Sequence, residues 1–88
     1  MTLRIEKASA PGYLMVRLIG RMQSEHLPDL KRYIETTGSN PTLDLEEVTL
    51  VDLEAVRFLI GCEYAGIQLL HCSPYIRQWM EREQPDGR

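Results

Sequence analysis

Two histidines and two cysteines are the residues most suited by type to metal binding: His26, His71, Cys62 and Cys72. Imidazole nitrogens and thiolate sulfurs are the usual ligands of zinc in proteins. Structural zinc sites usually take ligands in close pairs separated by about two to four residues, and these residues form no such pair. His71 and Cys72 are adjacent, so on a strand their side chains would point to opposite faces. The spacing therefore predicts no metal site and no cofactor.

Nucleophilic catalysis has no better support in the residue pattern. The serines fall at turns or helix starts, where hydrogen bonds to the neighbouring backbone explain them: Ser9, Ser24, Ser39 and Ser73. No serine lies in a G-x-S-x-G elbow, and no glycine-rich phosphate loop occurs. The paired carboxylates Glu46 and Glu47 have the pattern of a solvated surface. We therefore predict that the chain is not an enzyme.

Composition narrows the class of protein further. The 88 residues are 43% hydrophobic and 26% charged, with a net charge of −3, which is typical of one small globular domain over residues 1–88. A mildly acidic chain lacks the clustered positive charge on which nucleic-acid binding depends. The longest apolar runs span about four residues, against roughly 20 for a membrane helix. We expect a cytoplasmic domain with free thiols, no nucleic-acid partner and no direct membrane insertion.

Hydrophobic periodicity predicts the elements that would position these residues. Alternating or continuous apolar runs predict strands at about residues 2–6, 13–19, 42–45 and 67–72. Apolar residues three and four apart predict helices at about residues 24–35, 53–64 and 74–82, followed by a frayed tail at 83–88. The apolar faces expected on the last two helices are Val56, Leu59, Ile60 and Tyr64, and Tyr75, Ile76, Trp79 and Met80.

Local signals mark the ends of these elements. Pro11-Gly12 predicts a turn between the first two strands, and Gly38 suits the left-handed end of the first helix. Asp52 and Ser73 are placed to cap the second and third helices. The order is ββαβαβα, and strands joined through helices should run parallel. The prediction is an α/β fold with a single small domain and a mixed four-stranded sheet.

This order and three local strings resemble the STAS domain, the family of sulfate-transporter and anti-sigma-factor antagonist domains. Leu18–Met22 resembles the L-x-G-R-L that ends the family's second strand. Leu43–Asp52 resembles its L-D-L strand followed by V-x-x-[IV]-D at the head of a helix. Gly66–Arg77 resembles its later glycine, strand and S-P-x-[VI]-R helix start. The similarity extends from Leu3 to about Glu83 and implies the STAS fold.

The resemblance implies a non-catalytic module that docks a protein partner, such as an anti-sigma factor of the histidine-kinase-like class. The contact would use the end of the second strand and the loop and helix start at Thr49–Arg57. The residues expected to contact the partner are Met22, Gln23, Ser24, Thr49, Val51, Asp52, Leu53, Glu54 and Arg57. Residue chemistry alone also explains Asp52 as a helix cap and Leu53 as a core residue.

Two departures from the family pattern matter. In phosphorylation-switched members a serine or threonine follows the aspartate, whereas Leu53 stands there in this chain and has no hydroxyl. Glu54 could supply a permanent negative charge at the same helix start, or could simply be an acidic residue of the kind favoured there. Longer members continue into a fifth strand and a fourth helix, whereas this chain stops after the third helix. We expect a short variant without the phosphorylation switch.

The family resemblance leaves a second function open. STAS domains also occur in sulfate carriers and lipid exporters, which would make this chain a cytoplasmic accessory subunit of a membrane transporter. A homodimer is a further expectation, because a short chain would leave one sheet edge uncovered. Tyr75 and Trp79 could mark a partner groove, although their helical spacing favours packing against the sheet.

Overall fold

One mixed sheet organises the chain. The computed structural model describes residues 3–10, 13–36 and 40–84. The strands are β1 (Leu3–Ala10), β2 (Tyr13–Met22), β3 (Thr42–Val51) and β4 (Gln68–Leu70), in the spatial order β1-β2-β3-β4. β1 is antiparallel to β2, whereas β3 is parallel to both β2 and β4. The predicted α/β class and mixed four-stranded sheet are confirmed.

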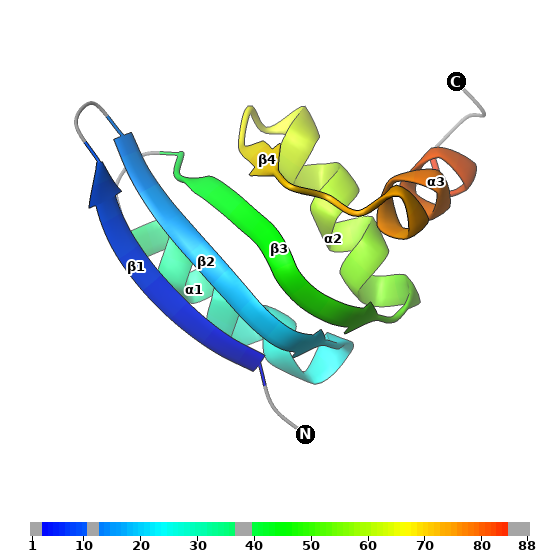
Figure 1. Cartoon of the computed structure of the whole chain (residues 1–88), viewed down its shortest axis with the longest axis horizontal. Coiled ribbons are helices and arrows are strands. Elements are labelled where there is room, and N and C mark those ends of the chain that lie inside the picture. Colours follow the sequence, from blue (N-terminus) through cyan, green and yellow to red (C-terminus); the bar gives the residue numbers. More distant parts are fainter. Residues whose placement is uncertain (1–2, 11–12, 37–39, 85–88) are drawn as a thin grey trace.

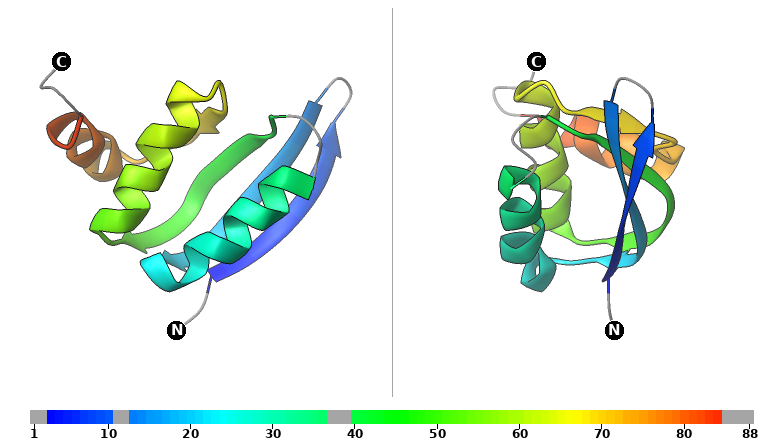
Figure 2. Two further views of the ribbon diagram at one scale, coloured as in Figure 1. Left: turned by 180° about the vertical axis from the view of Figure 1, so that it is seen from behind. Right: turned by 90° about the vertical axis from the view of Figure 1, so that its left-hand side faces the viewer.

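Two of the helices lie on one side of this sheet, and the last lies beyond its β4 edge (Figures 1 and 2). A short 3-10 turn, η1 (Ser24–His26), leads into α1 (Leu27–Thr36), and α2 (Leu53–Tyr64) and α3 (Pro74–Arg82) follow β3 and β4. α1 and α2 cover the same face, and α3 packs against α2 beyond β4 (Figures 1 and 2). The opposite face of β2 and β3 is left without a helix (Figure 2). That open face is where side chains of the sheet reach solvent.

The core lies between the sheet and the helices, as the alternation of the strands requires. Val16 and Leu18 on β2 and Leu43 and Leu45 on β3 point to the same side and are almost completely buried. The helices meet them with further buried side chains: Leu27, Leu30, Ala55, Val56, Leu59, Ile60, Ile76 and Met80. Full burial of each such leucine or isoleucine contributes about 1.5–3 kcal/mol, which holds the helices to this face.

Both predicted helix caps are confirmed. The Asp52 carboxylate accepts a hydrogen bond from the backbone N–H of Ala55, and the Ser73 hydroxyl accepts one from the backbone N–H of Ile76. Pro74 occupies the first turn of α3, where a missing N–H costs nothing. α2 has the predicted bounds, 53–64.

The strand boundaries differ from the prediction: β1 and β2 continue to Ala10 and Met22, beyond the predicted ends at about residues 6 and 19. Residues 46–51 were expected to belong to a connection, but β3 continues to Val51 by pairing with β2 through two register shifts. Such irregularities break the alternation of apolar and polar residues, so the strand is hard to detect in the sequence. β4 is shorter than predicted and ends at Leu70, after which His71 adopts a positive φ of 56°.

Two aromatic residues expected on buried helix faces are exposed. Tyr64 is 69% exposed at the last turn of α2, and Tyr75 is 51% exposed at the start of α3. α3 packs mainly on α2 rather than on the sheet, so its apolar stripe is narrower than predicted. Trp79 is partly buried against the core, and Ile76 and Met80 are fully buried.

Some predictions fall on residues that the structure does not describe. The turn at Pro11-Gly12, the helix end at Gly38 and residues 85–88 of the tail lie outside the described residues. Among the helices that are described, none has the length and apolar character needed to cross a bilayer.

Candidate functional site

Two polar regions lie on β3, one in the middle of the strand and one at its end. The first is the Asp44 cluster, which consists of Arg17, Asp44, Glu46 and His71. The second lies where β2 and β3 end and α2 begins. We call its exposed or half-exposed residues the tip surface: Gln23, Ser24, Thr49, Leu50, Leu53, Glu54 and Arg57.

Asp52 forms hydrogen bonds with both chain segments of the tip, η1 and the first turn of α2. One carboxylate oxygen, Oδ1, accepts from the backbone N–H of Ala55 at 2.9 Å, and Oδ2 accepts from the backbone N–H of Ser24 at 2.9 Å. The first bond caps α2, and the second fixes η1 beside it. Because both oxygens are engaged within the protein, Asp52 positions the tip surface rather than presenting a free charge to a partner.

A second local arrangement orders the β2 side of the tip. The backbone N–H of Gln23 donates to Nδ1 of His26 at 3.2 Å, and the backbone N–H of His26 donates to the carbonyl of Gln23 at 2.9 Å. The His26 ring also lies 3.5 Å from Glu25 and is largely buried. The imidazole is therefore engaged in shaping this turn, which removes it from the set of candidate metal ligands.

Two leucines give the tip surface its apolar character. Leu53 is 37% exposed in the first turn of α2, and Leu50 is 41% exposed near the end of β3. Leu53 was predicted as a contact residue, whereas Leu50 was not. Two exposed leucines within four residues of chain give the tip surface apolar area that is available for burial against a partner.

Two predicted contact residues do not reach the surface. Met22 is completely buried and Val51 is 4% exposed, and the two are paired across β2 and β3. Both belong to the face of the sheet that the helices cover, so their side chains are part of the core. A docking surface at this end of the molecule must therefore omit Met22 and Val51.

The charges of the tip surface are mixed. Arg57 lies 3.7 Å from Glu54 one turn earlier in α2 and 4.0 Å from Glu83 after α3. All three side chains are partly or largely solvated, so these ion pairs contribute at most about 1 kcal/mol each. Thr49, near the end of β3, is exposed and carries a hydroxyl. The surface is apolar at the two leucines and polar around them.

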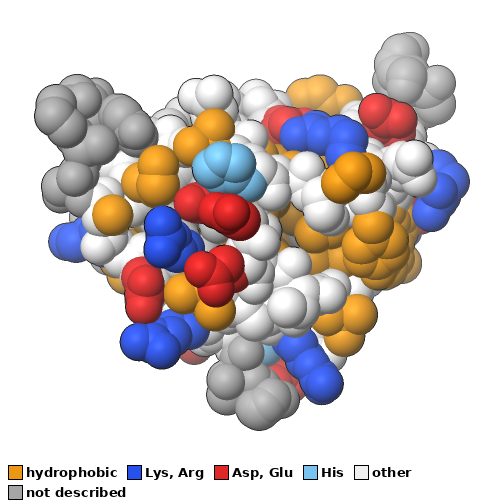
Figure 3. Space-filling model, in the orientation of Figure 1, with side chains coloured by type: hydrophobic (Ala, Val, Ile, Leu, Met, Phe, Trp, Pro, Cys, Tyr) orange, Lys and Arg blue, Asp and Glu red, His pale blue; other side chains and the backbone are white. Residues whose placement is uncertain are grey.

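The Asp44 cluster lies on the open face of the sheet. Figure 3 shows acidic, basic and histidine side chains gathered on this face over β2 and β3. Arg17 is the cross-strand neighbour of Asp44, and His71 follows Leu70, the neighbour of Asp44 on β4. Although it points away from the core, the Asp44 side chain is only 3% exposed. The side chains around it shield it from solvent.

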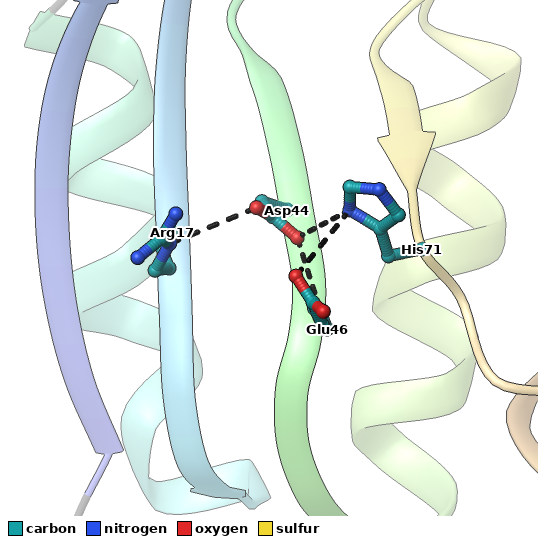
Figure 4. Close-up of polar contacts among 4 residues, drawn as sticks. All are labelled: Arg17, Asp44, Glu46 and His71. Carbon is teal, nitrogen blue, oxygen red and sulfur yellow. Dashed lines mark hydrogen bonds and ion pairs between the residues drawn. The ribbon is translucent and has the colours of Figure 1, made fainter.

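The Asp44 carboxylate makes polar contacts with Arg17, Glu46 and His71 (Figure 4). Oδ1 accepts from the backbone N–H of Glu46 at 3.0 Å and lies 3.0 Å from Nδ1 of His71. Oδ2 lies 3.7 Å from Nε of Arg17. The same Nδ1 of His71 is 3.9 Å from Oε1 of Glu46. The two sides of Asp44 thus face a permanent cation and a titratable one.

The pKa values follow from these contacts. Burial alone would raise the pKa of Asp44, but the Glu46 N–H, the His71 ring and the Arg17 charge outweigh it, and the net pKa is lowered. The hydrogen bond to Asp44 raises the pKa of His71, with Glu46 adding to the effect. The cluster therefore favours an ionised Asp44 beside an imidazole that holds its proton more strongly than usual.

The four residues first considered as zinc ligands are not brought together. Among the described residues, the group of three or more histidine, cysteine and acidic side chains with mutually close ligand atoms is Asp44, Glu46 and His71. Cys62 is buried, which raises the pKa of its thiol to about 12, and Cys72 is half-buried. A thiol of such high pKa is a poor nucleophile and a poor metal ligand.

The Asp44 cluster was missed in the sequence. Its members come from β2, β3 and the residue after β4, so only the strand register brings them together. One signal was present: in Leu43-Asp44-Leu45 the aspartate must point to the face opposite the two buried leucines. Because His71 was assigned to a strand, its turn toward Asp44 could not be anticipated.

A shallow groove of about 400 Å³ lies elsewhere, between α1 and α2. Its apolar lining includes Ile34, Phe58 and Ile67, and Lys31 and Arg57 are among its charged residues. Cys62 also contributes to the lining, but its buried thiol has a strongly raised pKa. These residues form no arrangement of nucleophile and base.

Comparisons with known proteins bear on the fold. No protein-family model and no curated protein matches the sequence. Among solved structures, an uncharacterized DUF3478-family protein with a SpoIIAA-like fold from Shewanella loihica PV-4 is similar, with a TM-score of 0.56 and 14% sequence identity. The match covers 91% of this chain and 74% of that chain. The likeness concerns the fold alone: this chain has a SpoIIAA-like fold, which is the fold of the STAS and anti-sigma-factor antagonist domains.

Proposed function

We infer that this chain is a non-catalytic protein-binding module of the anti-sigma-factor antagonist type, which docks a regulatory protein through the tip surface. The observation that carries the proposal is the exposure of Leu50 and Leu53, at 41% and 37%, on a tip that Asp52 holds in place. A rigid apolar anchor with polar residues around it is the usual centre of a protein interface. The SpoIIAA-like fold supports the same type of module.

The proposed mode of action is contact without chemistry. Leu53 occupies the position at which phosphorylation-switched STAS domains carry a hydroxyl, so this module would remain in one binding state. Thr49 is the hydroxyl residue of the Thr49–Arg57 segment. Incubation with a kinase-like partner and ATP should leave the protein unmodified, as measured by intact mass. Phosphate found on Thr49 would show that the module is switched after all.

The substitution Leu53→Arg tests the docking surface. It places a charge at the proposed centre of the interface and leaves the core intact, because the side chain is already partly solvated. Tyr64→Arg is the matched control, since Tyr64 is an exposed apolar residue at the other end of the same helix. We expect native lysate to yield a partner with the wild type and with Tyr64→Arg, and none with Leu53→Arg.

The identity of the captured protein distinguishes the candidate classes of partner. A histidine-kinase-like regulator would support the antagonist function, whereas a transporter component would assign the chain to a membrane transport complex. Equal capture by Leu53→Arg and the wild type would place the docking site elsewhere. Sedimentation of the purified protein separately measures whether it associates with itself.

A further inference from the structure

We propose that Asp44, Glu46 and His71 bind a divalent first-row transition metal ion, of which Zn²⁺ is the representative, on the open face of the sheet. The three side chains come from β3 and from the residue that follows β4. Their side chains lie close together between β3 and the segment that follows β4, as Figure 4 shows. This site is separate from the tip surface and does not depend on the proposed docking function.

The donor atoms are already close to coordination spacing. Nδ1 of His71 lies 3.0 Å from Oδ1 of Asp44 and 3.9 Å from Oε1 of Glu46, and all three atoms lie within 4.8 Å of one another. Ligands bound at about 2.0–2.2 Å around a tetrahedral or octahedral ion lie about 3–3.5 Å apart. The pair formed by His71 and Asp44 has nearly this spacing. Glu46 needs only a small movement, and its side chain is 65% exposed and free to make it.

Asp44, the buried ligand, is held in its orientation by other groups. The backbone N–H of Glu46 and the guanidinium of Arg17 contact the two oxygens of Asp44, whose side chain is 3% exposed. Hydrogen bonds of this kind orient metal-binding carboxylates in known sites. One lone pair of Oδ1 accepts from the Glu46 N–H, and the other faces His71. A metal ion would take the place now occupied by the contact between Oδ1 and Nδ1.

The donor set selects the class of ion. One imidazole nitrogen and two carboxylate oxygens suit zinc, cobalt, nickel or manganese, whereas magnesium and calcium prefer oxygen alone. Two carboxylate charges would neutralise a divalent ion, and Arg17 would remain beside the outer oxygen of Asp44. Three protein ligands leave further coordination positions to water, because His71 and Glu46 are solvent-exposed.

The test is a calorimetric titration of untagged, metal-free protein with Zn²⁺. We expect one ion per chain, with affinity falling at least about tenfold in His71→Ala and in Glu46→Gln, as is usual when a metal-site group is removed. Both residues are exposed, so both variants should fold, and circular dichroism checks that they do. His26→Ala is the matched control, because His26 is engaged in its own turn and should not contribute.

The competing outcomes are distinct. Binding that is absent from the wild type, or unchanged in His71→Ala, overturns the proposal and leaves the cluster an ion-pair network. Titration with Co²⁺ tests whether a cysteine binds the metal instead. A cobalt–thiolate charge-transfer band would show that Cys72 or Cys62 holds the metal. A cobalt spectrum without that band, lost in His71→Ala, supports the site as described.

Discussion

Two aspartates of one segment, Asp44 in the middle of β3 and Asp52 just after it, use the same side chain in different ways. Each accepts a backbone hydrogen bond close in sequence, from Glu46 and Ala55 respectively. Asp52 adds one further backbone donor, whereas Asp44 adds two side-chain partners from other elements, the Arg17 cation and the titratable His71, and is 3% exposed. Asp52 therefore serves as a double acceptor of backbone N–H groups, and Asp44 depends on its charge.

This difference decides what a substitution by asparagine should do. Asparagine keeps a carbonyl oxygen that accepts hydrogen bonds but loses the negative charge. A cap needs only the acceptor, and asparagine is as good an N-cap as aspartate. A carboxylate between an arginine and a histidine loses its charge-assisted contacts. The same replacement at the two positions should therefore separate the two roles.

The largest effect is expected at Asp44. Asp44→Asn should lower the free energy of unfolding by about 1.5–3 kcal/mol, because a hydrogen bond to a charged partner in a shielded position is worth about that much. Urea denaturation with a chelator present measures the change without any contribution from bound metal. A loss below about 0.5 kcal/mol would show that the charge of Asp44 stabilises nothing.

A smaller effect is expected at Asp52. Asp52→Ala should lower the free energy of unfolding by about 1–2 kcal/mol, since the cap of α2 and the bond to Ser24 are both lost. Asp52→Asn should restore only part of this loss, because its carbonyl oxygen can cap α2 but its NH2 group cannot accept from the Ser24 N–H. The comparison would fail if Asp52→Asn were as damaging as Asp52→Ala, because a neutral cap oxygen would then contribute nothing to stability.

The smallest effect is expected for an ion pair on the same open face. Arg4 and Glu6 are 3.1 Å apart on β1, but their side chains are 74% and 41% exposed. Arg4→Ala should change the free energy of unfolding by less than about 0.5 kcal/mol, because solvent screens such a pair. The same denaturation assay provides this baseline. A loss as large as that of Asp44→Asn would show that burial does not explain the stability lost in Asp44→Asn.

Features that depend on contacts between residues close in sequence could be predicted, whereas features that depend on contacts between distant residues could not. The cap at Asp52, the cap at Ser73 and the bounds of α2 depend on residues three or four apart, and all were predicted correctly. The order of elements and the mixed sheet followed from periodicity. The Asp44 cluster depends on strand register and on the turn at His71, which no local pattern encodes.

The tip shows how one wrong boundary affects a predicted site. Once residues 46–51 are taken as a connection, Val51 is as free to face solvent as Leu50. In a strand paired with β2, Val51 is opposite Met22 and both are buried, while Leu50 is exposed. Leu53 was placed correctly in the first turn of α2, because the helix start was predicted correctly.

The central claim, that the tip surface is the docking surface, is tested most directly by photo-crosslinking at a single position. A photoreactive amino acid in place of Leu53 should, on irradiation in native lysate, form a covalent adduct with one protein. The same amino acid in place of Tyr64, which at 69% is more exposed than Leu53 and lies at the far end of α2, should form none. Adducts at Tyr64 and none at Leu53 would contradict the account and move the interface to the other end of the helix.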